Sequence, residues 1–156
     1  DGQESIQKGV LALKDVCSET DVILVHDGIR PFVPEEVISD AIHVCQRWDS
    51  GLSAVRCQET IVRTADGISG SEGIGRQEIM RVQTPQAYRY GLVRWAYEEA
   101  ERRGIHGEVY VNTLMLHLGE TVYFSKGSEK NVKITTMDDL ELFKALLHME
   151  REDWVK

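Results

Sequence analysis

The chain lacks the features that mark several large classes of protein. It has no apolar run near the ~20 residues that a membrane-spanning helix needs, and it shows no signal-peptide pattern. It also lacks an excess of base, because the net charge is -8 at pH 7, which argues against general affinity for nucleic acid or anionic membranes. The five histidines show no metal-ligand spacing. The remaining composition, 42% hydrophobic and 28% charged over 156 residues, is ordinary for one domain with a core.

Cysteine is scarce as well. The chain has three, Cys17, Cys45 and Cys57, which are widely spaced and lie in apolar contexts. An odd number of separated cysteines does not suggest a disulfide framework, so we expect reduced thiols in or near the core of a cytoplasmic protein. A catalytic cysteine is the less favoured alternative, because the sequence suggests no histidine partner for it.

The most informative stretch is VILVHDGIRPFV, residues 22–33. Its first four residues form an apolar run without alternation, which is typical of a strand buried on both faces of a parallel sheet. The run ends on polar residues, with Asp27 and Gly28 followed by Arg30. Ligands of open α/β sheets bind beyond the carboxyl ends of the strands, so these residues suggest a site. A loop with a surface ion pair is an equal alternative on this local pattern alone.

The order of the elements predicts an α/β domain. Helical spacing of apolar residues predicts helices over 3–13 and 35–48, and short apolar runs predict strands over 21–26 and 51–57. Helix–strand–helix–strand order at these lengths indicates a parallel sheet with right-handed crossovers. The pattern breaks at residues 58–82, where two β-like flanks surround a glycine-rich centre. We interpret this segment as a projecting hairpin arm, which is favoured over a phosphate loop because no lysine–serine pair follows.

The C-terminal half continues the alternation. A helix is predicted from Ala87 to Arg103, with Leu92, Val93, Ala96 and Ala100 facing inward, and a short helix ends at Gly119. Strands are predicted over 121–125 and 131–135. Thr136 and Asp139 form a capping box for a last helix, which is expected to bury Leu140, Phe143, Leu146 and Leu147. We therefore expect a single domain over 1–156 that carries the arm at 58–82.

Three segments in this order resemble one enzyme family. HDGIRPFV, VQTPQAY (82–88) and NVKITTMDDL (131–140) resemble the cytidylyltransferases that act on 2-C-methyl-D-erythritol 4-phosphate or ribitol 5-phosphate, and the resemblance runs from Ser5 to about Leu147. It implies a Rossmann-like nucleotide-diphospho-sugar transferase fold, a three-layer α/β sandwich with a mostly parallel sheet. It also implies transfer of CMP from CTP to a polyol phosphate, with Mg²⁺ as cofactor and a homodimer held by the arm.

The resemblance implies a role for eight residues. Lys133 corresponds to a lysine that stabilises the pentacoordinate phosphorus, Asp27 to an aspartate that faces the polyol, and Arg30 to an arginine that supports the same pocket. Arg76 corresponds to an arginine that reaches the substrate phosphate of the neighbouring subunit. The other matching positions contact nucleotide or substrate; they are Ser5, Thr60, Thr84 and Thr135. Without the resemblance each has an ordinary interpretation, as a solvated lysine, a loop charge or a β-branched strand residue.

Two departures from the family pattern bear on function. The family's strand and glycine-rich loop for the triphosphate would precede Asp1, so we expect this chain to lack them and to be inactive alone. The family also has a Thr-Asp pair where this chain has Val109-Tyr110, with Asn112-Thr113 slightly later. Either Asn112-Thr113 substitutes for that pair or the contact is absent. Residues 60–62 lack the lysine common in the methylerythritol enzymes, which leans towards another polyol such as ribitol.

Two alternatives to this function stay open. The chain could be a non-catalytic dimerisation or regulatory module that kept the fold. It could also be a nucleotidyltransferase that uses another base, because the base pocket of the family lies mostly outside the matched segments.

Overall fold

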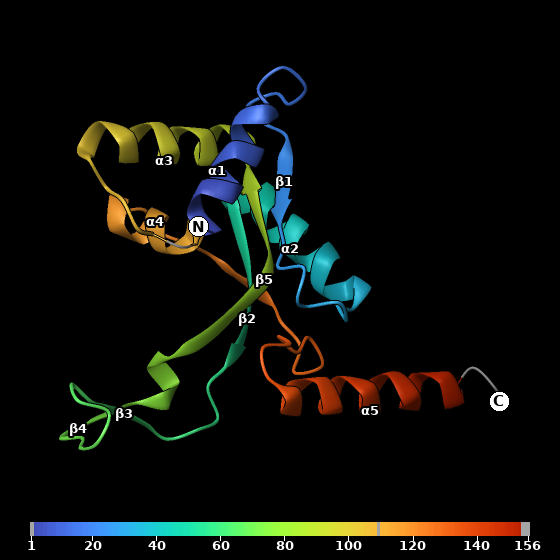
Figure 1. Cartoon of the computed structure of the whole chain (residues 1–156). Helices are drawn as coiled ribbons and strands as arrows, with labels where there is room; N and C mark the ends of the chain where they lie inside the picture. The colour runs from blue at the N-terminus through green and yellow to red at the C-terminus, as the bar shows by residue number, and fades with distance from the viewer. Residues whose placement is uncertain (1, 109, 154–156) are drawn as a thin grey trace.

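A computed structural model describes residues 2–108 and 110–153 of the chain (Figure 1). Its helices and strands follow one another in this order: α1 (Gly2–Ala12), β1 (Val22–Val25), α2 (Glu35–Trp48), β2 (Ser50–Arg56), β3 (Ile61–Arg63), β4 (Glu72–Ile74), the 3₁₀ turn η1 (Arg76–Glu78), β5 (Met80–Arg89), α3 (Tyr90–Arg103), α4 (Val111–Leu118), β6 (Phe124–Lys126) and α5 (Met137–Asp153). No helix in these described ranges is long and apolar enough to cross a membrane.

The central sheet is mixed. Its strand order is β1-β5-β2-β6, and β5 runs antiparallel to both of its neighbours while β2 and β6 are parallel. Strands β1, β2 and β6 therefore share one direction, as the α/β prediction requires. Strands β1 and β2 are not neighbours, because β5 lies between them. The strand over 21–26 was expected to be buried on both faces, but β1 is an edge strand among the described residues and Leu24 is 42% exposed.

Helices cover both faces of the sheet, which gives the expected three layers (Figure 1). Helices α1, α3 and α4 pack on one face, where the core includes Val10, Leu52, Tyr88 and Leu114. Helix α2 packs on the other face through Ala41 and Cys45. The approach of α2 is close: a Cβ at Gly51 would lie 2.2 Å from the Ala41 carbonyl oxygen, so only glycine fits there. Cys45 and Cys57 are buried, Cys17 is half-buried, and all three are free thiols, as predicted.

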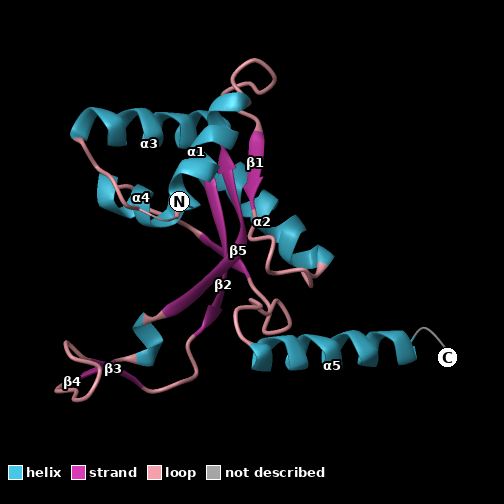
Figure 2. Cartoon of the chain, in the orientation of Figure 1, coloured by secondary structure: helices cyan, strands magenta, loops and turns pink. Residues whose placement is uncertain are grey.

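The arm leaves this sandwich. Among the residues that the structure describes, β3 and β4 pair only with each other, in an antiparallel hairpin that projects away from the sheet below β5 (Figures 1 and 2). The hairpin predicted over 58–82 is therefore present, although its second flank, β5, extends into the main sheet.

Some of the predicted boundaries are confirmed and others are wrong. Helix α2 matches its predicted range, and α4 ends at Gly119, whose φ of 91° suits a residue without a side chain. The helix predicted from Ala87 begins only at Tyr90, because residues 80–89 form β5 between two strands. Residues 131–135 were predicted as a strand but form a loop, and the preceding strand is confined to β6 (Figure 2).

Helix α5 lies beside the sandwich rather than in its layers (Figure 1). Its capping box is confirmed: the Thr136 N–H donates to Asp139 Oδ2 over 2.8 Å, and the Asp139 N–H donates to Thr136 Oγ1 over 3.2 Å. The apolar residues that the helix was expected to bury are only half-buried; they are Leu140, Phe143, Leu146 and Leu147.

Candidate active site

The site begins where β1 ends. The Asp27 N–H donates to Thr84 Oγ1 over 3.0 Å, and the Arg30 N–H closes a turn onto the Asp27 carbonyl over 3.0 Å. Thr84 lies on β5, which pairs with β1 through Val25 opposite Gln86. The antiparallel neighbour β5 thus fixes the direction in which the 27–30 turn leaves the sheet.

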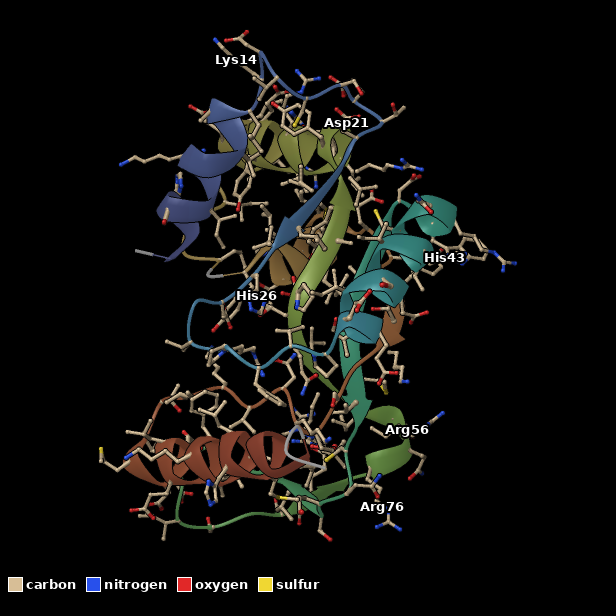
Figure 3. All side chains as sticks on the ribbon, turned by 90° about the vertical axis from the view of Figure 1, so that its right-hand side faces the viewer. Lys14, Asp21, His26, His43, Arg56 and Arg76 are labelled. Carbon is tan, nitrogen blue, oxygen red and sulfur yellow. The ribbon has the colours of Figure 1, made fainter. Side chains whose placement is uncertain are left out.

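His26 ties the same turn to β5. Its Nε2 lies 2.9 Å from the Arg30 carbonyl oxygen, which only accepts, so Nε2 carries the proton. Its Nδ1 lies 3.1 Å from Thr84 Oγ1, whose hydroxyl can donate to it while accepting the Asp27 N–H. The imidazole therefore joins the two sides of the turn. Figure 3 shows His26 at the end of β1, in the middle of the molecule.

The loop after β6 brings Lys133 to this turn. The Ile134 N–H donates to the Ile29 carbonyl over 2.8 Å, and the Arg30 guanidinium donates to the Asn131 carbonyl over 2.6 Å. The Asn131 side chain, only 1% exposed, donates to the Thr84 carbonyl over 2.7 Å. These contacts clamp the loop onto both β5 and the turn.

Three charged groups converge as a result. Asp27 Oδ2 lies 3.4 Å from Lys133 Nζ and 3.6 Å from Arg30 Nε, and the three side chains are 25%, 32% and 11% exposed in that order. Burial lowers the pKa of Arg30, against the opposing effect of Asp27. Burial also acts to lower the pKa of Lys133, but the hydrogen bond to Tyr110 and the charge of Asp27 outweigh it and raise that pKa. Two cations against one carboxylate leave one net positive charge, which suits an anionic ligand.

These groups line a pocket of about 210 Å³. Its wall consists of Asp27, Arg30, Val82, Gln83, Thr84, Gln86, Tyr110, Asn112 and Lys133. Lys133 Nζ lies 3.3 Å from the Tyr110 hydroxyl and 5.5 Å from the centre of its ring. Most of the lining side chains carry hydrogen-bonding groups, and two of them are cationic, which suits a small, hydroxylated anion.

A buried glutamine of the pocket lining, Gln83, holds the loop that carries Lys133 in place. Gln83 Nε2 donates to the Ser128 carbonyl over 2.9 Å, and its Oε1 accepts from the Ser128 N–H over 3.1 Å. Both ends of the amide are thereby used to hold the loop that carries Lys133. The geometry therefore depends on residues of β5 and the loop that touch one another rather than a ligand.

The eight residues singled out from the sequence fall into two groups. Asp27, Arg30, Thr84 and Lys133 meet in the pocket. The other four lie outside its lining in this chain; they are Ser5 on α1, Thr60 before β3, Arg76 on η1 and Thr135 before α5.

The local contacts of two of these outlying residues are defined. Arg76 is exposed near the base of the arm, away from His26 (Figure 3), and its guanidinium donates to the Gln58 carbonyl over 3.3 Å. Thr135 donates from its N–H and from its hydroxyl to Asp139 Oδ2, each over 3.0 Å, as part of the cap of α5.

Several other residues of the site are not among the candidates from the sequence. Gln83 and Gln86 lie inside the QTPQ motif beside the candidate Thr84. Asn131 opens the NVKIT motif, which contains the candidates Lys133 and Thr135. Tyr110 and Asn112 stood out only as a departure from the family pattern. The structure places both in the pocket, whereas Thr113 donates its hydroxyl to the Tyr110 carbonyl over 2.9 Å.

The fold and the pocket place the chain among proteins of known structure. It resembles the 2-C-methyl-D-erythritol 4-phosphate cytidylyltransferase of Thermus thermophilus with a TM-score of 0.79 and 27% identity, covering 94% of this chain and 69% of that one. The same enzyme of Francisella tularensis gives a TM-score of 0.79 and 27% identity, covering 90% and 65%. Residues 1–149 match the model of the 2-C-methyl-D-erythritol 4-phosphate cytidylyltransferase (IspD) family, and the chain belongs to this family.

Curated relatives carry either of two substrate names. The chain is 44% identical over 147 residues to the ribitol-5-phosphate cytidylyltransferase of Lacticaseibacillus paracasei, covering 93% of this chain and 63% of the relative. It is 38% identical over 149 residues to the 2-C-methyl-D-erythritol 4-phosphate cytidylyltransferase of Bacillus pumilus, covering 96% and 63%. The chain thus spans less than two thirds of the length of these relatives.

Proposed function

We propose that the protein transfers CMP from CTP to a phosphorylated polyol, forming a CDP-polyol and pyrophosphate. The observation that carries the proposal is the convergence of Asp27, Arg30 and Lys133 on a polar pocket of about 210 Å³. Membership of the family supports it.

The chemistry asks for charge and position rather than for a nucleophilic side chain. An oxygen of the polyol phosphate forms a bond to the α-phosphorus of CTP, and the bond from that phosphorus to the bridging oxygen breaks. Pyrophosphate leaves with the electron pair. Positioning and electrostatic stabilisation supply most of the catalysis in such transfers. In this proposal Lys133 stabilises the charge that develops on the α-phosphate, Asp27 accepts hydrogen bonds from polyol hydroxyls, and Arg30 supports Asp27 and the loop.

Ribitol 5-phosphate is the polyol phosphate that we favour over 2-C-methyl-D-erythritol 4-phosphate. Among the lining residues Val82 is the sole aliphatic side chain, and most of the others carry hydrogen-bonding groups. One aliphatic side chain is available to pack against a methyl branch, whereas most of the other lining side chains can hydrogen-bond to a hydroxyl. The relative at 44% identity bears the ribitol name, which also supports this choice.

Mg²⁺ enters the proposal as a companion of the CTP phosphates. Among the described residues there is no group of three or more histidine, cysteine or acidic side chains that could hold a metal ion. The one carboxylate that lines the pocket, Asp27, already faces two cations. A resident metal does not fit this arrangement, so we assign no step to it. Mg²⁺ is commonly held by substrate phosphates with few protein ligands.

We infer that the arm joins two copies of the chain. An isolated two-stranded hairpin is marginal in water, and this one exposes Val62 to 51% and Ile68 to 92%. A two-fold pair is the commonest assembly that covers such surface. Arg76 and Thr60 would then reach the pocket of the neighbouring subunit, which supplies a reason for their distance from Asp27 in their own chain. Ser5 and Thr135 keep their proposed contacts with nucleotide and substrate.

A turnover panel tests the activity. The full natural protein is incubated with each of CTP, ATP, GTP and UTP, together with ribitol 5-phosphate or 2-C-methyl-D-erythritol 4-phosphate, and pyrophosphate release is measured. We expect release with CTP and one polyol phosphate. Release with another nucleotide would favour the transferase of different base specificity. No release from any pair would refute the proposal in favour of a non-catalytic module.

Subunit mixing tests the shared site. Neither Arg76→Ala nor Asp27→Ala alone should be active, but a mixture that exchanges subunits should regain part of the activity, because one site of the mixed pair keeps both residues. Failure of complementation despite demonstrated exchange would place the action of Arg76 within its own chain or outside the site.

A further inference from the structure

A chain of hydrogen bonds runs from the buried core to the half-buried wall of the pocket. Tyr88, which is fully buried on β5, lies with its hydroxyl 2.7 Å from Gln86 Oε1. Gln86 Nε2 lies 3.2 Å from the Gln83 carbonyl oxygen and 3.5 Å from Asn112 Oδ1. Asn112 lies in the first turn of α4 and lines the pocket.

One backbone group, the Gln83 carbonyl, determines which atoms donate and which accept along this chain of hydrogen bonds. A backbone carbonyl oxygen only accepts, so the end of the Gln86 amide that faces the Gln83 carbonyl must be the amino end. The opposite orientation would place two acceptors against each other at 3.2 Å, with the side chain 4% exposed and unable to turn to water. Gln86 Oε1 therefore faces Tyr88, whose hydroxyl donates to it.

The same reasoning fixes the orientation of the Asn112 side-chain amide. Because Gln86 presents its amino group, the Asn112 atom that faces it must be the oxygen, since two N–H groups cannot bond to each other. The amino group of Asn112 then turns to the other side of the amide, with two N–H donors. The orientation of the Asn112 amide is in this way set by the Gln83 carbonyl, to which it is linked by two successive hydrogen bonds through Gln86.

We propose, resting on the proposed function, that Asn112 determines polyol specificity by donating a hydrogen bond to one hydroxyl oxygen of the substrate. Gln86 and Tyr88 are positioning residues that hold it as a donor. Asp27 is the acceptor of the same pocket, so the two residues present opposite polarity to neighbouring hydroxyls. An aspartate at position 112 would present an acceptor and would add a second negative charge to a pocket that receives a phosphate.

The inference is tested by pairing variants with substrate analogues. Wild type, Asn112→Leu and Asn112→Asp are assayed with the polyol phosphate that gives turnover, ribitol 5-phosphate in the first instance, and with its mono-deoxy analogues. Both kcat/KM and the Kd of the polyol phosphate by calorimetry are measured. Leu116→Ala, an exposed position on the same helix, controls for effects on α4.

We expect Asn112→Leu to lower kcat/KM and to weaken binding of the natural substrate by about 3- to 10-fold, the range for one uncharged hydrogen bond. Wild type should lose a similar factor on one deoxy analogue, while Asn112→Leu should lose nothing further on that analogue, because both changes remove the same bond. Asn112→Asp should lose more than Asn112→Leu, and Leu116→Ala should behave as wild type.

The outcomes separate this inference from the activity on which it rests. If wild type turns over the polyol phosphate but the losses from Asn112→Leu and from every deoxy analogue simply multiply, the donor role of Asn112 is refuted and the proposed function stands. If wild type neither binds nor converts any polyol phosphate, the proposed function fails and the inference fails with it.

Discussion

Replacement of Asn131 by alanine should destabilise the protein and displace Lys133. The Asn131 side chain donates to the Thr84 carbonyl over 2.7 Å, and both residues are buried, at 1% and 5% exposure. Removing the donor leaves the carbonyl without this partner and away from water, which costs about 1–3 kcal/mol. The Asn131 Oδ1 atom has no partner in the described structure, so its loss offsets part of that cost. We expect a net loss of about 2 kcal/mol in the free energy of unfolding, within the range for a broken buried contact.

Urea unfolding measures this loss. With a slope of about 1–3 kcal/mol/M, a loss of about 2 kcal/mol lowers the unfolding midpoint by roughly 1 M at unchanged slope. Asn112→Ala is the matched control, because it removes the same amide from a half-buried position with a bond of 3.5 Å, and it should shift the midpoint far less. If the two variants shift the midpoint equally, or if Asn131→Ala shifts it not at all, the clamp between the loop and β5 does not hold the fold.

Local patterns predicted the elements whose stability is local. Helix α2 carries Val37, Ala41 and Cys45 on one buried face, and its amphipathic spacing gave both of its ends. The capping box of α5 was predicted from the residue types of Thr136 and Asp139 alone, because both hydrogen bonds form within four residues. Such features need no knowledge of the rest of the chain.

Non-local pairing explains the predictions that were wrong. Residues 87–89 follow a helical pattern into α3, yet pairing of β5 with both β1 and β2 keeps them extended up to Arg89. Conversely, residues 131–135 have strand-like composition but find no strand partner. Their backbone instead bonds to Ile29, and the Arg30 guanidinium reaches the Asn131 carbonyl across 101 positions of sequence. Sheet order of this kind is set by tertiary packing, which outweighs propensity.

The same distinction applies to the site. Asp27, Arg30, Thr84 and Lys133 each lie in a motif that the resemblance identified, and the structure brings them together. The donor orientation of Asn112 had no sequence signal, because it depends on a carbonyl of β5 and on the packing of α4 against that strand. The specificity that we propose for this pocket thus depends on contacts among the protein's own amides, which a motif match does not reveal.

Two further variants test the charges at either end of the 131–139 segment. Lys133→Ala should lower turnover about 10²-fold while changing substrate binding less, because the lysine acts on charge that develops in the transition state; Lys130→Ala, an exposed lysine of the same loop, should not. Normal turnover with a raised KM would assign Lys133 to ground-state binding. The second variant is Asp139→Asn. Hydrogen bonds from the Thr135 N–H, the Thr136 hydroxyl, the Thr135 hydroxyl and the Thr136 N–H lower the pKa of Asp139 from 3.8 to about 2. A depressed carboxyl stabilises the folded state above its ordinary pKa, and that contribution is lost as the pH falls from about 4 to about 2. The amides of the first turn of α5 should therefore lose protection from hydrogen exchange across this interval in wild type. Because other carboxyls titrate in the same range, the difference between wild type and Asp139→Asn is the quantity to compare. The variant should lack this step, since its amide does not titrate, and an identical pH profile in both proteins would show that the cap does not depend on the ionised carboxylate.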